Sequence, residues 1–147
     1  MNLLKYLLPV CFLCLIACNN QQQENTDDAI GDVELPNGFS EFYQRFHSDS
    51  TFQMDHIIFP LEGVPDNADK ETIDAGEFRW QRKDWSLMHP VDYQMSEYQR
   101  QFIPLTDEMV VERILHKNGQ FGMVRRFAII SDEWHLIYYA GVNRLAQ

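Results

Sequence analysis

The sequence is poor in cysteine and in basic residues, and both shortages restrict its chemistry. Its three cysteines, Cys11, Cys14 and Cys18, all lie near the N-terminus. The rest of the chain therefore has no disulfide, no cysteine metal ligand and no thiol nucleophile. Twelve Lys and Arg residues against 22 Asp and Glu residues give a formal net charge of −10. Such a charge argues against nucleic acid as a partner and against an electrostatic contact with anionic lipids.

Motifs of the common enzyme classes are missing as well. The chain has no G-x-S-x-G, no phosphate-binding glycine loop and no glycine-rich dinucleotide signature. The spacing of its five histidines is neither H-x-H nor H-x-x-x-H, so no metal site is expected. These histidines are His47, His56, His89, His116 and His135. We expect no cofactor and assign no catalytic residue from motifs.

An apolar run with one charge, Lys5, opens the chain. It is too short for a permanent membrane span and indicates a removed signal peptide, residues 1–17. The alternative is an uncleaved anchor helix, but the polar run 19–24 follows without a Lys or Arg stop-transfer signal. The end of the run, Leu15-Ile16-Ala17-Cys18, resembles a bacterial lipobox. There, cleavage after Ala17 leaves Cys18 to take a diacylglyceryl group.

Lipidation at Cys18 would attach the mature chain to a bilayer. Each buried methylene contributes about 0.8 kcal/mol, so two or three acyl chains, palmitate among them, make attachment effectively permanent. We expect a lipoprotein of a Gram-negative cell envelope, in the outer membrane rather than the inner. Both a periplasmic and a surface-facing leaflet are compatible with the sequence. Loss of Lys5 changes the net charge from −10 to −11. Residues 18–36 are polar and predict a lipidated flexible tether.

Residues 37–147 have the length of one small domain. Aromatic residues recur near its start at i, i+3, i+4 and i+7: Phe39, Phe42, Tyr43 and Phe46. This spacing predicts a helix, capped by Asn37 or Ser40, whose aromatic stripe packs on a sheet. Residues 47–50 can end it and cap a short second helix.

The middle of the chain gives weaker signals. Residues 57–59 are apolar and predict a strand or buried connection that closes at Pro60. Residues 62–76 are rich in Gly, Asp and Asn and predict a loop, and the spacing within 93–102 fits a helix. Between them, residues 78–85 carry Trp80 and Trp85 among basic side chains. They form either a sugar-stacking platform or core aromatics flanked by basic side chains.

The last forty residues predict two hairpins. With Asn118-Gly119 as a two-residue turn, Glu112 faces Arg125, and Val110, Ile114 and His116 face Phe127, Met123 and Phe121. Counting across Asp132-Glu133 pairs Ile129 with Leu136 and Phe127 with Tyr138. The resulting sheet has an apolar face that contains the Glu112 and Arg125 pair. Its other face is partly solvated and carries Arg113, Arg126, His135 and Tyr139.

Several of these features occur together in one known family. They are the F-x-x-F-Y-x-x-F helix, then F-Q-x-x-x-I-x-F-P-L from Phe52 to Leu61, two central tryptophans, and Trp134-x-Leu136 after a hairpin. From about Phe39 to Gly141 the chain resembles an uncharacterised lipoprotein family of the nuclear-transport-factor-2-like (cystatin-like) class. The resemblance implies an α+β cone: N-terminal helices packed on a bent, mostly antiparallel sheet around a cavity. Homodimers are common in this class, but no activity transfers with a fold.

Two residue pairs remain as candidates for chemistry. Asp55 and His56 form an adjacent acid and imidazole, although neighbours in a strand point to opposite faces. Glu112 and Arg125 could orient a polar ligand in the cone cavity, or form a structural cross-strand pair.

Two classes of function follow. The protein is either a membrane-anchored, non-catalytic module that binds a small ligand or an envelope protein, or a cone-pocket hydrolase or isomerase using Asp55, His56 or Glu112 as general acid or base. An accessory or inhibitory subunit is a third alternative.

Overall fold

The computed structural model describes residues 33–145. The predicted signal peptide, the cleavage position Ala17, the lipidated Cys18 and most of the 18–36 tether lie outside the described residues. Within the described part of the chain, no helix is long and apolar enough to cross a membrane.

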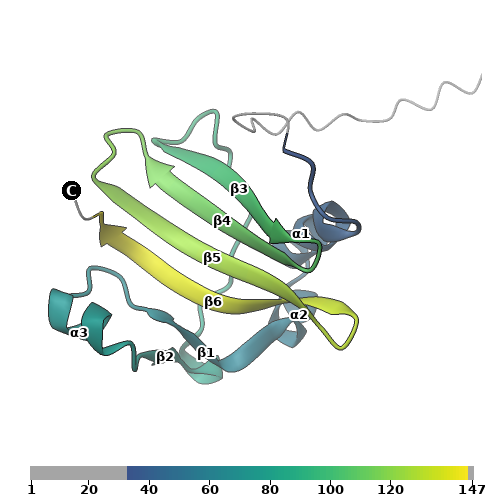
Figure 1. Cartoon of the computed structure of the whole chain (residues 1–147), viewed down its shortest axis with the longest axis horizontal. Coiled ribbons are helices and arrows are strands. Elements are labelled where there is room, and N and C mark those ends of the chain that lie inside the picture. Colours follow the sequence, from purple (N-terminus) through teal and green to yellow (C-terminus); the bar gives the residue numbers. More distant parts are fainter. Residues whose placement is uncertain (1–32, 146–147) are drawn as a thin grey trace, which may run out of the picture.

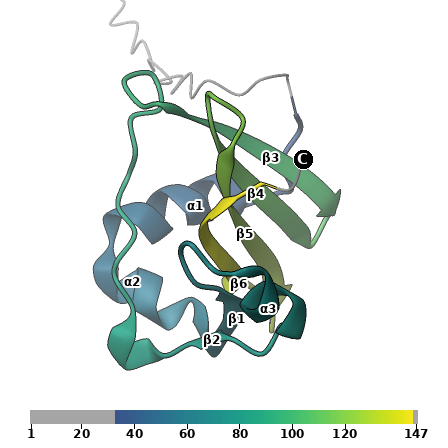
Figure 2. The ribbon, with the colours of Figure 1, turned by 90° about the vertical axis from the view of Figure 1, so that its left-hand side faces the viewer.

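A six-stranded sheet with helices α1 and α2 on one side forms the domain (Figures 1 and 2). Its strand order is β2-β1-β6-β5-β4-β3. Strands β1 and β6 are parallel, and all other neighbouring pairs are antiparallel. The elements are α1 (Phe39–Ser48), α2 (Ser50–Asp55), β1 (Ile57–Val64), α3 (Lys70–Ala75), β2 (Arg79–Trp80), η1 (Arg82–Asp84), β3 (Tyr98–Thr106), β4 (Met109–His116), β5 (Phe121–Ile130) and β6 (Glu133–Arg144).

Helix α1 packs its aromatic stripe on the sheet, as its spacing predicts. The ring of Phe39 is fully buried and lies edge-on to the rings of Phe127 and Trp134, at centroid distances of 5.6 and 5.1 Å. Burial of each such ring contributes about 1.5–3 kcal/mol. The cap prediction was wrong: Gly38, in the left-handed region at φ 75°, occupies the N-cap, so Asn37 precedes the cap and Ser40 already lies inside the helix.

The register of the β4–β5 hairpin is as predicted. Glu112 pairs with Arg125, Val110 with Phe127 and Ile114 with Met123. The β5–β6 register was predicted two residues out, since Phe127 pairs with Leu136 and Ile129 with Trp134. The turn residues are Ser131 and Asp132, with φ of 51° and 69°. Two successive positive φ values suit the tight turns that match the twist of a hairpin.

A bulge in β6 changes which tyrosine faces the helices. Arg126 pairs with Tyr138 but Phe127 pairs with Leu136, so β6 has one extra residue at this point. Beyond the extra residue, side chains alternate in the opposite sense. Tyr139, opposite Arg125, therefore lies on the inner face, and Tyr138, opposite Arg126, lies on the outer one. The sequence prediction had placed these two tyrosines the other way round.

Three further predictions need correction. Residues 62–76 are not all loop, because β1 continues through a cis Phe59–Pro60 bond to Val64 and α3 follows. Residues 93–102 are not a helix, because strand β3 begins at Tyr98. Tyr98 and Phe102 are four residues apart, which places them on one face of a strand as well as of a helix. Pro104 fits in β3 because this strand is at the edge of the sheet.

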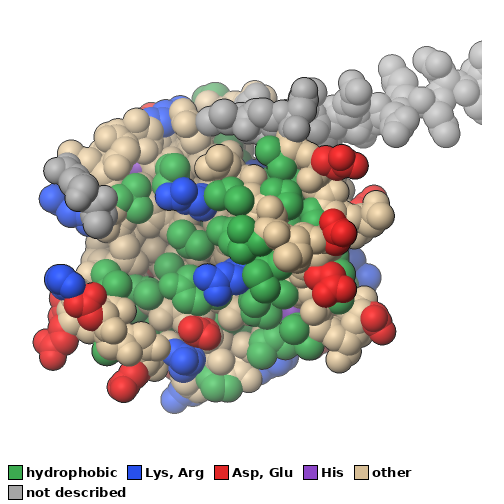
Figure 3. Space-filling view, in the orientation of Figure 1, with side chains coloured by type: hydrophobic (Ala, Val, Ile, Leu, Met, Phe, Trp, Pro, Cys, Tyr) green, Lys and Arg blue, Asp and Glu red, His purple; other side chains and the backbone are tan. Residues whose placement is uncertain are grey.

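The outer face of the sheet is the one seen in Figure 3. Hydrophobic side chains gather over the central strands, with Lys and Arg groups among them. The half-buried Arg126 lies over the ring of Tyr138, with the guanidinium carbon 5.0 Å from the ring centroid.

Candidate functional site

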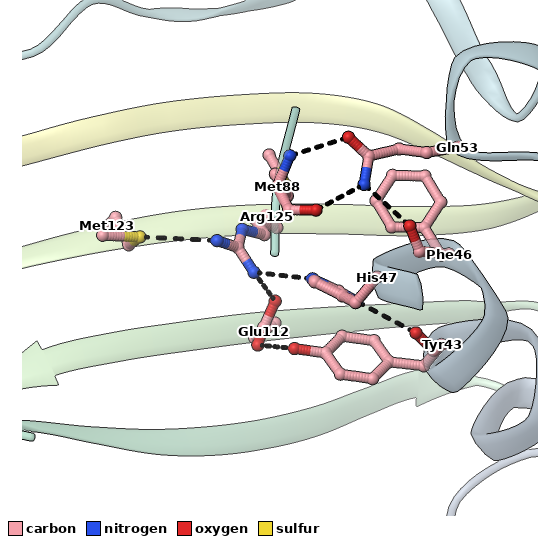
Figure 4. A network of polar contacts seen from close by, with 8 residues as sticks. All are labelled: Tyr43, Phe46, His47, Gln53, Met88, Glu112, Met123 and Arg125. Carbon is pink, nitrogen blue, oxygen red and sulfur yellow. Dashed lines mark hydrogen bonds and ion pairs between the residues drawn. The ribbon is translucent and has the colours of Figure 1, made fainter. Parts of the chain in front are cut away.

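A buried cluster of polar side chains joins helix α1 to strands β4 and β5 (Figure 4). Nη1 of Arg125 donates to Oε2 of Glu112 at 3.0 Å, and the Tyr43 hydroxyl donates to the other carboxylate oxygen at 2.5 Å. Glu112 is fully buried and Arg125 is 7% exposed. Both carboxylate oxygens thus have donors, which compensates for loss of water at a buried charge.

His47 completes the cluster as a neutral imidazole. Its Nδ1 lies 2.9 Å from the Tyr43 carbonyl oxygen, which only accepts, so Nδ1 carries the proton. Its Nε2 lies 3.3 Å from Nη1 of Arg125, which only donates, so Nε2 accepts. Burial is the main cause that lowers the pKa of His47, and the charge of Arg125 lowers it further.

Tyr43 and Arg125 also have shifted pKa values. Burial, and then the charge of Glu112, raises the pKa of Tyr43, which stays a neutral donor. Burial, the largest single effect, lowers the pKa of Arg125, but Glu112 together with Tyr43, Tyr93 and Tyr139 more than offsets it, and the net direction is upward. Glu112 and Arg125 therefore form one neutral ion pair. The Nε atom of Arg125 is buried without a hydrogen-bond partner in the described part of the chain.

A pocket of about 370 Å³ opens beside this cluster. It lies between α1, the connecting residues 90–93 and β3. Its lining residues are Tyr43, Gln44, His47, Ser48, Pro90, Val91, Tyr93 and Arg100. Glu112 and Arg125 are not among them. Tyr43 and His47 belong both to the cluster and to the pocket wall, so they connect the ion pair to the pocket. The predicted pair thus supports the pocket from behind.

Arg100 supplies a cation to the pocket wall. It is 9% exposed, and its guanidinium carbon lies 4.8, 4.9 and 5.4 Å from the ring centroids of Phe102, Tyr93 and Tyr43. Aromatic faces stabilise a cation that has lost most of its water. Burial, followed by the charge of Glu112, raises the pKa of Tyr93 to about 12.

Gln53 fixes the connecting segment that forms the far wall. Its buried side-chain nitrogen donates to the carbonyl oxygens of Phe46 and Met88 at 2.7 and 2.8 Å, and its oxygen accepts from the Met88 N–H at 2.8 Å (Figure 4). Figure 2 shows this segment on the helix side of the sheet. One amide from α2 therefore holds the chain two residues before the pocket wall begins.

Asp55 and His56 lie at the end of α2 and not in a strand. The Asp55 carboxylate lies 3.6 Å from Nη2 of Arg82. Nδ1 of His56 lies 2.8 Å from the Phe52 carbonyl oxygen, and its Nε2 lies 4.0 Å from the Glu133 carboxylate. The two side chains thus have different partners, and neither lines the pocket.

Trp80 and Trp85 pack against each other and against Tyr139 of β6. Their ring centroids are 6.0 Å apart, and that of Tyr139 lies 5.3 and 5.5 Å from them. Nε1 of Trp80 donates to the Tyr139 carbonyl oxygen at 2.9 Å. We call these three residues with Phe59 the aromatic cluster. It adjoins the main hydrophobic core and is separate from the pocket.

A larger and more open hollow of about 700 Å³ lies where the chain enters the domain. Its walls are residues 34–37, residues 104–108 and Ile129. The acids in these walls are exposed, so water already solvates them. No group of three or more His, Cys, Asp or Glu side chains in residues 33–145 could hold a metal ion. The smaller pocket, with its buried polar wall, is therefore the candidate site.

The sequence prediction missed most of this site. Arg100 and Tyr93 were assigned to a helix, and His47 only to a helix end. The alternation Tyr98, Arg100, Phe102, with Gln99 and Gln101 between them, was a strand signal that could have placed Arg100 on the inner face.

The architecture is the nuclear-transport-factor-2-like, or cystatin-like, α+β fold, as expected. A cystatin-like protein from Bacteroides caccae has a TM-score of 0.52 and 20% identity, over 73% of this chain and 79% of that chain. An NTF2-like protein from Bacteroides fragilis has a TM-score of 0.48 and 17% identity, over 74% of this chain. The match covers 48% of that protein, so this chain spans about half its length.

A protein of unknown function from Pectobacterium atrosepticum has a TM-score of 0.32 and 11% identity, over 73% of this chain and 87% of that chain. No family model and no curated protein matches the sequence. At these identities the likeness shows the fold alone, and a fold does not specify an activity.

Proposed function

We propose that the protein is a lipid-anchored binding module of a bacterial cell envelope. It takes a small ligand into the pocket between α1, residues 90–93 and β3. One observation carries this proposal: a pocket of about 370 Å³ ends on Tyr43 and His47, whose positions are fixed by a buried hydrogen-bonded cluster. Known small-molecule sites are mostly preformed hollows of about 300–1,000 Å³ with a few fixed polar groups.

Binding fits this cluster better than acid–base catalysis does. A general base needs a free lone pair within hydrogen-bond reach of the substrate. Glu112 is fully buried and does not line the pocket, and both nitrogens of His47 lie within hydrogen-bond distance of a protein atom. A cone-pocket enzyme that used Glu112 would need this carboxylate to be uncovered, and one that used His47 would need one of these contacts to break.

The anchor is proposed from the lipobox-like sequence at Cys18. In a Gram-negative host, the full chain should be found in the membrane fraction, in the outer membrane rather than the inner. The mass of its N-terminal peptide should include acyl chains on residue 18. The variant Cys18→Ser should lose these chains, since serine offers no thiol. An unmodified Cys18, or a retained Met1, would contradict the proposed anchor.

Ligand binding can be tested on the mature chain, residues 18–147, carrying Cys18→Ser. We expect members of a small-fragment collection to shift the backbone amide resonances of residues 43–48, 91–93 and 100 in an NMR screen. Val91→Trp places a bulky ring at a half-exposed position of the pocket wall and should abolish these shifts. Ile73→Trp, at a 43% exposed position on α3, is the matched control and should preserve them. A screen in which no fragment shifts these residues would overturn the proposal.

A further inference from the structure

We infer that the outer face of the sheet is a docking surface for another protein, one that presents a carboxylate among apolar side chains. The surface consists of two rows of paired residues, which we call the outer-face patch. No residue of the patch lines the ligand pocket, so this inference goes beyond the proposed function. The first row takes one residue from each strand: Ile103, Val111, Arg126, Tyr138, Glu62 and Arg79. The second row includes Arg113, Val124 and Ala140.

The middle of the patch is apolar, although no helix covers it. The solvent-facing side of an antiparallel sheet normally carries polar side chains. Here Val111, Val124 and Ala140 are half-buried and lie on three adjacent strands. Helices α1 and α2 pack on the opposite face, and Figure 3 shows hydrophobic side chains gathered over the central strands. A continuous exposed apolar surface is typical of a protein contact.

Two arginines without an acidic partner lie within this apolar surface. Arg113 is opposite Val124, which is two residues before Arg126, so the two arginines are diagonal neighbours on β4 and β5. Such neighbours are about 7–8 Å apart. Neither arginine forms a hydrogen bond or a salt bridge within residues 33–145. A carboxylate placed between them would form charge-assisted contacts with both.

Arg126 is positioned for such a contact before a partner arrives. Its guanidinium carbon lies 5.0 Å from the ring centroid of Tyr138, which is its pair on β6. This cation–π contact restricts the arginine side chain, so less conformational entropy is lost on binding. Arg and Tyr are also enriched among the residues that dominate the binding energy of protein interfaces. We therefore place the centre of the contact at Arg126.

The distribution of acids favours a protein over an anionic membrane surface. Glu62 lies within the first row, and Asp and Glu side chains gather at one border of the face (Figure 3). An anionic bilayer would bring its head groups against these acids as well as against the arginines. A protein, in contrast, can place one carboxylate at the centre and basic side chains at the border.

A second copy of this chain fits the patch less well. Two patches packed face to face would bring the Arg113 and Arg126 guanidinium groups of both copies into one interface. Like charges that meet in an interface are unfavourable. The patch itself supplies Glu62 as a carboxylate, but Glu62 already has Arg79 opposite it.

Site-specific photo-crosslinking of the full chain in its native host cells tests the inference. The photoreactive residue p-benzoylphenylalanine replaces Gln101, an exposed residue opposite Arg113, or Glu41, an exposed residue of α1 that serves as the control. We expect an adduct with another protein from position 101 and not from position 41. The crosslinked segment of that protein should contain Asp or Glu among apolar residues.

Charge reversal then tests the role of the arginines. Arg113→Glu with Arg126→Glu should lower the adduct yield at least about tenfold, because like charges would then meet. Lys83→Glu with Lys117→Glu, at exposed positions outside both rows, makes the same change in net charge and should leave the yield unchanged. Replacing the partner's crosslinked acid with Lys should restore the adduct of the double arginine variant.

Several results would overturn the inference. They are no adduct from position 101, an adduct with a second copy of this chain or with lipid, a partner segment without acids, and an equal yield from the double arginine variant. Circular dichroism checks that this variant folds. If it does not, Arg113→Gln with Arg126→Gln takes its place, and a yield equal to that of the native chain would again overturn the inference.

Discussion

The inner face of one sheet carries two clusters that are held together by different forces. The first consists of Tyr43, His47, Glu112 and Arg125, and we call it the polar cluster. The aromatic cluster lies near the other edge, on β1, β2 and β6 and at Trp85 after η1, where rings pack mainly on rings. In the polar cluster each group depends on a specific partner, because an unpaired buried polar atom costs far more than a lost apolar contact.

The comparison shows that one set of residues positions the pocket wall and a separate set stabilises the opposite edge of the sheet. Polar side chains adjoin the pocket, and their mutual bonds set the positions of Tyr43 and His47 in its wall. The aromatic cluster stabilises the opposite edge of the sheet and adds no group to the pocket. Damage to one cluster should therefore change ligand binding, and damage to the other should change stability alone.

The largest expected effect is that of Glu112→Ala. This change leaves the guanidinium of Arg125 buried without its carboxylate, and we expect it to lower the free energy of unfolding by about 3–5 kcal/mol. Urea unfolding followed by circular dichroism measures the loss. The double variant Glu112→Met with Arg125→Met is the control, since it removes both charges and should recover most of the loss. A single variant as stable as the native chain would show that the pair is dispensable.

An intermediate effect is expected for Trp80→Ala in the aromatic cluster. The indole is half-buried and packs on Trp85 and Tyr139, so we expect a loss of about 2–4 kcal/mol in urea unfolding. Trp80→Phe keeps a ring, loses the hydrogen bond to the Tyr139 carbonyl oxygen, and should cost less. Binding of small fragments to the pocket, measured by NMR, should be unchanged in both variants. Weakened binding would mean that the two clusters are coupled.

The smallest effect concerns pH and His47. Its pKa is lowered in the folded protein, so below the unfolded pKa the unfolded chain binds a proton that the native state does not. Stability due to neutral His47 is therefore complete above the unfolded pKa of about 6.5 and falls as the pH drops below it, by at most about 1.4 kcal/mol per pH unit. The groups that face this imidazole are Tyr43, Glu112, Arg100 and Arg125.

Urea unfolding at several pH values tests this dependence. The variant His47→Gln should flatten the curve relative to the native chain. His89→Gln, at an exposed position, is the matched control and should follow the native curve. Parallel curves for the native chain and His47→Gln would show that His47 titrates alike in the folded and unfolded states.

The sequence predicted the parts of the fold that local chemistry determines. Asn118-Gly119 lies at the centre of a turn that spans residues 117–120 and not two residues, but counting outward from this centre placed Glu112 opposite Arg125 correctly. The bulge in β6 has no such local signal. It arises where one extra residue must be accommodated between paired strands, and it reversed the predicted sides of Tyr138 and Tyr139.

The pocket was harder to predict because it joins residues that are distant in sequence. Tyr43 and Arg100 lie on different elements, and a four-residue spacing in 93–102 was compatible with both a helix and a strand. Gln53 gave no sign of its role, since only the folded chain brings its amide to Met88.

The side-chain amide of Gln53 also restricts where the pocket can widen. Three hydrogen bonds join it to Phe46 and Met88, and all three would have to break before the helices and the following segment could separate there. That end of the connecting segment is thereby fixed. A bulkier ligand would have to displace the other end of the segment, which carries Tyr93.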